Sequence, residues 1–324
     1  MQKKIKVGII GGAGYTGGEL IRVLLNHPLV EMVFVHSKSN AGKALSQVHT
    51  DLLGDTHQQF TNTIVNEIDV LFLCVGHGES EKFLAGNNIS KQVKCIDLSE
   101  DFRIGKNKHW VYGLPELNRN EIKKGELNIA NPGCFATCIQ LAILPLAHAR
   151  LLKHDVHVNG ITGSTGAGQS LSNTSHFSYR NNNISAYKTF THQHLKEIHQ
   201  SIQQLQNRIS PAIYFIPNRG CFTRGIYTTL YTKSELSLEA LNLLYEKYYA
   251  THPFVHISGV PIDLKQVVNT NKCLLYLEKQ GDQLLITSAI DNLLKGASGQ
   301  AVQNMNLLFG IEETTGLKLK ATGF

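Results

Sequence analysis

The chain has 324 residues, of which 42% are hydrophobic and 17% charged, a composition typical of a globular protein large enough for two domains. It contains no run of eighteen apolar residues, and its N-terminal segment breaks into glycines after a few apolar positions. We therefore expect neither a membrane-spanning helix nor a signal peptide, and a cytoplasmic location. The formal net charge of +6 comes from scattered basic residues, which suits anionic small molecules and argues against nucleic-acid binding.

Apolar runs in the first half of the chain are separated by enough residues for crossover helices. This alternation predicts an α/β domain whose parallel sheet is covered on both faces. The expected strands are 5–10, 32–35, 70–75 and 93–96, with a helical segment at 19–25.

After residue 150 the expected strands become longer. This half indicates an α+β domain with an antiparallel sheet, while a last helical stretch at 299–308 can pack on either domain. The expected strands are 156–161, 212–216, 225–232, 274–277 and 284–290, with helices at 193–206 and 236–249.

A GxGxxG motif lies between the first expected strand and the first helix. Glycines allow a tight turn and a close approach of the backbone to a pyrophosphate, while the helix N-terminus faces the phosphate charge. In this context the motif predicts dinucleotide binding; the alternative is a Gly-rich turn without a ligand. The motif residues are Gly12, Ala13, Gly14, Tyr15, Thr16 and Gly17.

About twenty residues further on, NAD enzymes place an acidic residue for the ribose hydroxyls. This chain has Ser37, Lys38 and Ser39 there instead. Hydroxyls and a cation suit a 2′-phosphate, so we predict NADP(H) rather than NAD; the alternative is a solvated loop.

Six cysteines show no CxxC pair and no zinc-type spacing, so most are predicted to be reduced core residues, without a metal. Two of them follow an Asn-Pro-Gly turn. Cys134 comes directly after the turn, where the start of a helix stabilises a thiolate, and is the predicted nucleophile. Cys138 falls on an apolar helical stripe and is predicted to be buried and inert. The alternative for Cys134 is a small residue at a helix cap.

Six segments, two of which contain the glycine motif and the cysteines above, occur in this order: GIIGGAGYTGGEL, IDLSEDFR, YGLPELNR, NPGCFATCIQLAILPLA, THQHLKEI and DNLLKGASGQAVQNMNLLFG. Together they resemble the N-acetyl-gamma-glutamyl-phosphate reductase family, NADPH-dependent enzymes of arginine biosynthesis. The resemblance implies a Rossmann domain followed by a catalytic and dimerisation domain of the glyceraldehyde-3-phosphate dehydrogenase type, in a homodimer or homotetramer. We accordingly expect domains at 1–148 and 149–298, with a C-terminal helix in 299–324 packing back on the first.

The resemblance also implies a mechanism in which the cysteine forms a thioester that accepts hydride. The family's His-x-His-x-x-Glu segment corresponds to His192, His194 and Glu197. We favour His194 as the acid/base, with His192 close behind, and expect Glu197 to orient an imidazole or to contact the substrate. A metal bound by the His-x-His pair is the competing interpretation, although no third ligand is evident at a telling spacing.

Other candidates are weaker. Arg103 is expected to bind the leaving phosphate, the alternative being a surface ion pair with Glu100 or Asp101. The loop GSTGAGQS could hold cofactor or substrate through Ser164 and Gly166. Tyr187 and Arg224 are candidates for substrate recognition, and Asn292 resembles the asparagine that meets the nicotinamide carboxamide.

The chain departs from the family at one place. It reads Gly-Cys-Phe-Ala-Thr where the familiar pattern is Gly-Cys-Tyr-Pro-Thr, so the cysteine is retained while its neighbours differ. Three alternatives stay open: an aspartate-semialdehyde dehydrogenase, a reductase of N-succinyl or carrier-linked acyl phosphates, and an NADP-sensing regulator.

Overall fold

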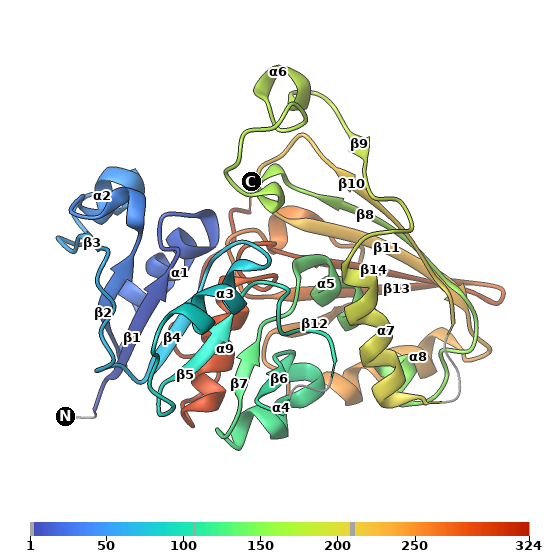
Figure 1. Ribbon diagram of the computed structural model, residues 1–324. Helices are drawn as coiled ribbons and strands as arrows, with labels where there is room; N and C mark the ends of the chain where they lie inside the picture. Colours follow the sequence, from blue (N-terminus) through green and yellow to red (C-terminus); the bar gives the residue numbers. More distant parts are fainter. Residues whose placement is uncertain (1–2, 106–107, 208–210, 324) are drawn as a thin grey trace. The chain divides into compact units, whose positions relative to one another are not determined.

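The computed structural model describes residues 3–105, 108–207 and 211–323. It separates into two compact units, one made of residues 1–132 and 297–318 and the other of residues 133–296 and 319–324 (Figure 1). The division falls just before Cys134, whereas the sequence places it after residue 148. The helix that begins at Cys134 is therefore part of the second unit.

The first unit is built on a parallel sheet with the order β3-β2-β1-β4-β5-β7-β6 (Figure 1). The predicted parallel α/β architecture is confirmed. Sequence patterns missed β3, β6 and β7 because these strands have only two or three residues. The strands are β1 (Ile5–Ile10), β2 (Val30–His36), β3 (Phe60–Thr61), β4 (Val70–Leu73), β5 (Lys94–Asp97), β6 (Trp110–Tyr112) and β7 (Asn128–Ala130).

Helices flank this sheet, and the last of them is buried along its whole length. This helix, α9, packs against α1 and α4. Its polar residues are paired inside the unit: the Asn304 amide donates to the Gly113 carbonyl at 2.8 Å, and Asn306 lies 3.0 Å from His27 Nε2. The helices are α1 (Tyr15–Leu25), α2 (Leu45–Val48), α3 (Glu79–Gly86), α4 (Pro115–Lys123) and α9 (Ser298–Leu308).

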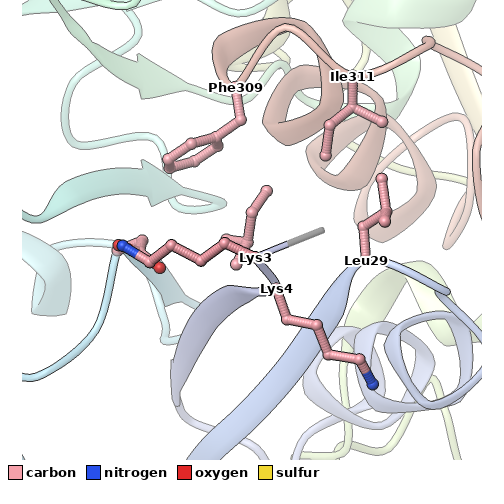
Figure 2. Close-up of a pocket in the computed structure, with 7 residues that line it drawn as sticks. Lys3, Lys4, Leu29, Phe309 and Ile311 are labelled. Carbon is pink, nitrogen blue, oxygen red and sulfur yellow. The ribbon is translucent and has the colours of Figure 1, made fainter. Parts of the chain in front are cut away.

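A pocket of about 240 Å³ opens beside the start of β1. Phe309 and Ile311, which follow α9, project towards the segment at Lys3 and Lys4, with Leu29 beside them (Figure 2). Ligands of parallel sheets bind at the carboxyl ends of the strands. This pocket lies at the amino end of β1, so it is separate from the glycine loop.

The second unit contains a sheet with the order β12-β13-β14-β11-β8-β10-β9. The expectation of an antiparallel sheet was wrong in part, because β8 pairs with β10 and β12 with β13 in parallel. The strands are β8 (Val156–Thr162), β9 (Ser185–Ala186), β10 (Ile213–Arg219), β11 (Ile226–Lys233), β12 (Val255–Ser258), β13 (Cys273–Gln280) and β14 (Gln283–Ile290).

Helix α5 forms the core of this unit. It is mainly apolar and buried from Phe135 to Ala147, as suits a helix enclosed by other elements, and it packs against β11, β14, α7 and α8. The phenol of Tyr245 on α8 donates to the carbonyl of Ala142 in α5 at 2.6 Å. The helices of the unit are α5 (Cys134–His148), α6 (Phe177–Arg180), α7 (His194–Leu205) and α8 (Leu238–Tyr249).

Across the described part of the chain, no helix combines the length and the apolarity needed to cross a membrane.

Candidate active site

The glycine loop connects β1 to α1, as the motif predicts. A Cβ on Gly12 would lie 2.2 Å from Val35, and one on Gly17 would lie 2.5 Å from the Gly11 carbonyl oxygen. At Gly14, the N-cap of α1, the nearest protein atom to such a Cβ is 3.7 Å away. The packing of the protein therefore does not require glycine at this position. A glycine there leaves room for a pyrophosphate to approach the backbone closely.

Two residues that the motif leaves out hold this loop in place. Gly11 has a left-handed φ of 78°, and both its N–H and that of Gly12 donate to the His36 carbonyl at the end of β2. The buried His49 imidazole lies 2.8 Å from the Gly12 carbonyl oxygen. Only the doubled glycine at 11–12 could have indicated Gly11 in advance, and nothing local in the sequence indicates His49.

The segment expected to meet the 2′-phosphate directly follows β2, next to the glycine loop. Ser37 is buried and Lys38 is exposed. The Asn40 side-chain amide donates to the hydroxyls of Ser37 at 3.3 Å and Ser39 at 3.2 Å. The structure thus brings the three predicted residues to the loop that would bind the pyrophosphate, with the lysine in the solvent.

Cys134 is the first residue of α5 and is partly exposed. The N–H of Gly133, the N-cap, donates to Glu197 Oε2 at 3.0 Å. A Cβ on Gly296 would lie 2.8 Å from the Cys134 Cβ, so the chain passes close to the nucleophile on that side. The position at the start of a fifteen-residue helix is the one that favours a thiolate.

Cys138, one turn later, is fully buried, as predicted. Burial raises the pKa of its thiol to about 12, so it stays protonated. Its surroundings are not purely apolar, because its Sγ lies 3.3 Å from the Ser288 hydroxyl and 3.4 Å from the Thr228 hydroxyl.

The two histidines of the His-x-His segment have different environments. His194 packs so tightly on the N-cap that a Cβ on Gly133 would lie 2.3 Å from its Nε2. Its Nδ1 accepts from the Ala136 N–H at 3.3 Å, and its Nε2 lies 3.9 Å from Glu197 Oε1, an ion pair when the imidazole is protonated. His194 and Glu197 therefore both contact the helix turn that begins at Cys134.

His192 lies two residues before the start of α7, and its Nδ1 accepts from the His194 N–H at 3.3 Å. Its ring meets that of Tyr187 edge-on at 5.8 Å. Burial lowers the pKa of His192 to about 4, so this imidazole is neutral at pH 7. Among the residues that the structure describes, no three His, Cys, Asp or Glu side chains gather as a metal site.

The low pKa of His192 has a consequence for stability. Between about 4 and 6.5 the unfolded chain binds more protons at this residue than the folded one, so the free energy of unfolding should rise with pH in that window. Denaturant titrations at pH 4.5 and 7 should show a smaller difference for His192→Asn than for the parent chain. An unchanged difference would mean that His192 titrates normally in the folded protein.

Two further candidates are already engaged within the second unit. The Arg224 guanidinium forms a two-pronged ion pair with the buried Asp291 carboxylate, with both N–O distances 3.0 Å. The Asn292 amide accepts from the Gly225 N–H at 2.7 Å and donates to Thr165 Oγ1 at 3.0 Å. These contacts brace the loop after β8, which carries Ser164 and Gly166, against the turn before β11.

Arg103 lies in the first unit. The alternative of a surface ion pair requires an exposed side chain, but Arg103 is buried. Only 4% of it is exposed. Its Nε donates to the Asn131 carbonyl at 2.8 Å and one Nη to the Leu98 carbonyl at 2.7 Å. These bonds attach the end of β5 to the segment that leads towards Cys134, whatever else the guanidinium binds.

Comparisons with known proteins agree with this geometry. Residues 6–125 match the family model described as semialdehyde dehydrogenase, NAD binding domain, and residues 134–292 match semialdehyde dehydrogenase, dimerisation domain. The chain therefore has the two-domain architecture of a semialdehyde dehydrogenase.

Its relatives narrow the family. A protein of Flavobacterium johnsoniae named N-acetyl-gamma-glutamyl-phosphate reductase is 59% identical over 99% of this chain and all of its own length. A protein of the same name from Christiangramia forsetii is 60% identical over the same shares. The chain belongs to the N-acetyl-gamma-glutamyl-phosphate reductase family.

Solved structures share the fold at low identity. An aspartate semialdehyde dehydrogenase II of Vibrio cholerae has a TM-score of 0.73 at 16% identity, covering 95% of this chain and 99% of its own. An aspartate semialdehyde dehydrogenase of Candida albicans, solved with NADP, has a TM-score of 0.66 at 14% identity over the same shares. The fold class predicted from the sequence is confirmed.

Proposed function

We propose that this chain reduces N-acetyl-gamma-glutamyl phosphate to N-acetylglutamate semialdehyde and phosphate with NADPH, through a thioester on Cys134. The observation that carries the proposal is the first turn of α5. There, a partly exposed cysteine sits at a helix start where the N-cap N–H is bonded to Glu197 and the Ala136 N–H of the same turn is bonded to His194. The 59% identity to reductases of that name supplies the substrate.

In the proposed mechanism the Cys134 thiolate attacks the γ-carbonyl carbon, a C–S bond forms, and the C–O bond to the leaving phosphate breaks. His194 takes up the thiol proton, the Glu197 carboxylate 3.9 Å away stabilises the imidazolium that forms, and the proton then passes to the departing phosphate. The glycine loop and the segment after β2 would hold NADPH, which would supply the hydride that reduces the thioester. The C–S bond then breaks, the aldehyde carbonyl forms, and Cys134 leaves as a thiolate.

The start of α5 would stabilise the carbonyl oxygen that gains charge during both steps. A helix start stabilises negative charge of this kind. Arg103 is the residue we propose for the leaving phosphate, because a guanidinium fork matches phosphate oxygens. Its bonds to the carbonyls of Asn131 and Leu98 hold the guanidinium in a fixed orientation.

A spectrophotometric assay tests the proposed function. Purified protein should reduce NADP when given N-acetylglutamate semialdehyde and phosphate, and should do so far more slowly with aspartate semialdehyde. Turnover of aspartate semialdehyde alone would indicate the sister enzyme. No turnover of any semialdehyde, with NADPH still bound, would indicate a regulator instead.

The preference for NADPH is tested at Lys38, which is exposed beside the glycine loop. A charge-assisted contact is worth about 1.5–3 kcal/mol, so Lys38→Glu should move the NADPH to NADH ratio of kcat/KM by about tenfold or more towards NADH. Lys91→Glu, an exposed lysine of the same unit, is the matched control and should leave the ratio unchanged. Equal ratios in the Lys38 variant and the parent would exclude this segment as the reader of the 2′-phosphate.

We further propose that the protein is a homodimer or homotetramer in the cytoplasm, where a reducing environment keeps the Cys134 thiol free. The second unit matches a dimerisation domain and exposes aromatic and aliphatic side chains on β10 and β11, among them Tyr214, Ile216 and Tyr231. Burying such a face is a common reason for self-association. Sedimentation velocity should give at least twice the chain mass.

A further inference from the structure

Arg219 is a cation near the nucleophile that no motif singled out. It is the last residue of β10, and β10 runs parallel to β8, so their carboxyl ends open at the same edge of the sheet. The residue is half-buried, and its Nε is buried without a hydrogen-bond partner. In the described ranges no carboxylate forms an ion pair with it. It shares a side-chain hydrogen bond with Tyr187, which still leaves the buried Nε unsatisfied.

A series of contacts leads from Arg219 to His194, which packs on the helix turn that begins at Cys134. Its guanidinium carbon lies 4.9 Å from the centre of the Tyr187 ring. The pKa of Tyr187 is raised to about 12, first by burial and then by the negative charge of Cys134, so the phenol lies within the electrostatic reach of the nucleophile. His192 completes the series, because its ring contacts both Tyr187 and His194.

Two other arginines of this unit have guanidinium groups that are engaged by several bonds within the protein, in contrast to Arg219. Arg224 is neutralised by the buried Asp291. Arg180 is 6% exposed and holds the loop before β9 in place through several bonds. Its guanidinium donates to the carbonyls of Thr174, Asn183 and Arg219 and to the Ser185 hydroxyl. Arg219 makes no comparable set of bonds to carbonyls within the described residues, while its own backbone is fixed by Arg180.

We propose that Arg219 binds a carboxylate of the substrate and, with Tyr187 beside it, sets which N-acyl amino-acid phosphate is accepted. A planar guanidinium that lacks a counter-ion matches a carboxylate in two-pronged geometry. Given the proposed function, the substrate carries such a group in its α-carboxylate. An N-succinyl substrate carries a second one at the end of its acyl group, whereas an N-acetyl substrate does not.

The test compares Arg219→Gln with the parent enzyme on the N-acetyl and N-succinyl forms of glutamate semialdehyde. We expect KM to rise about tenfold or more with kcat changed much less, because the contact is remote from the reacting carbonyl. A rise for both forms assigns Arg219 to the α-carboxylate, and a rise for the succinyl form alone assigns it to the acyl carboxylate. Arg219→Lys should recover part of the loss. Lys247→Gln, an exposed lysine of the same unit, should change nothing.

A binding measurement keeps this inference separate from the proposed function. Calorimetry with N-acetylglutamate and N-succinylglutamate on the Cys134→Ser protein requires no turnover. At least one of them should bind about tenfold more weakly or worse after Arg219→Gln is added, even if the parent chain proved inactive. Unchanged binding of both, no binding by the Cys134→Ser protein itself, or a fall in kcat with both KM values within twofold of the parent would overturn the assignment.

Discussion

Replacing Cys134 by serine is expected to lower the reduction rate by on the order of 10⁴-fold or more, while NADPH binding remains within a few-fold of the parent. A serine hydroxyl at the same helix start stays protonated and attacks an acyl phosphate poorly. Most of the residues expected to hold the cofactor, those of the glycine loop and the segment after β2, lie in the other compact unit. Stopped-flow reduction and fluorescence titration of NADPH measure the two quantities separately.

Cys138→Ala is the matched control for this experiment. Its thiol is buried, with a pKa raised to about 12, and it contacts Ser288 and Thr228 rather than a substrate. Activity should therefore stay within about threefold of the parent, with a modest loss of stability from the small cavity. Equal losses of activity in the two variants would contradict the division of roles between the cysteines.

His194→Asn should lower kcat by about 10²- to 10⁴-fold, the usual contribution of a positioned acid or base. The variant keeps a polar side chain of similar size against Gly133, so the fold should persist. The dependence of kcat on pH separates a catalytic role from a structural one. If His194 is the acid/base, the part of the pH profile that follows its titration should disappear in the variant. Circular dichroism and NADPH affinity should match those of the parent.

The companion variant His192→Asn distinguishes the two histidines. Burial holds His192 neutral, with a pKa of about 4, so it cannot donate a proton near pH 7. Its replacement should cost less in kcat than that of His194 and should leave that part of the pH profile in place. A larger effect at His192, together with loss of that part of the profile, would transfer the acid/base role to it.

Local patterns predicted the elements that bury long apolar runs. Strand β1, the glycine loop and α9 were evident because apolar periodicity and glycine spacing are properties of neighbouring residues. The same holds for the two cysteines: Cys134 lies at the start of the helix and Cys138 on its apolar face, and five neighbouring residues are enough to show this difference. The two- and three-residue strands β3, β6 and β7 have no such pattern, because their neighbours in the sheet rather than their own sequence place them.

Long-range partners lay beyond the sequence. Arg224 resembles a free substrate-binding cation until the structure shows Asp291, 67 residues away, filling its fork. Arg219 is the opposite case: no sequence pattern indicates it, and only its buried Nε and its contact with Tyr187 in the structure suggest a role. His49 bonds to the glycine loop from 37 residues away. Each contact is made by tertiary packing, which spacing along the chain does not encode.

Alkylation of the native protein followed by peptide mass spectrometry tests the central claim most directly. Limiting iodoacetamide at neutral pH should modify Cys134 first, in parallel with the loss of reductase activity, and a saturating acyl-phosphate substrate should protect it. The exposed Cys221 is the internal comparison, because it is accessible but does not lie at a helix start. Full modification of Cys134 with turnover retained would contradict a mechanism that passes through a thioester on this sulfur.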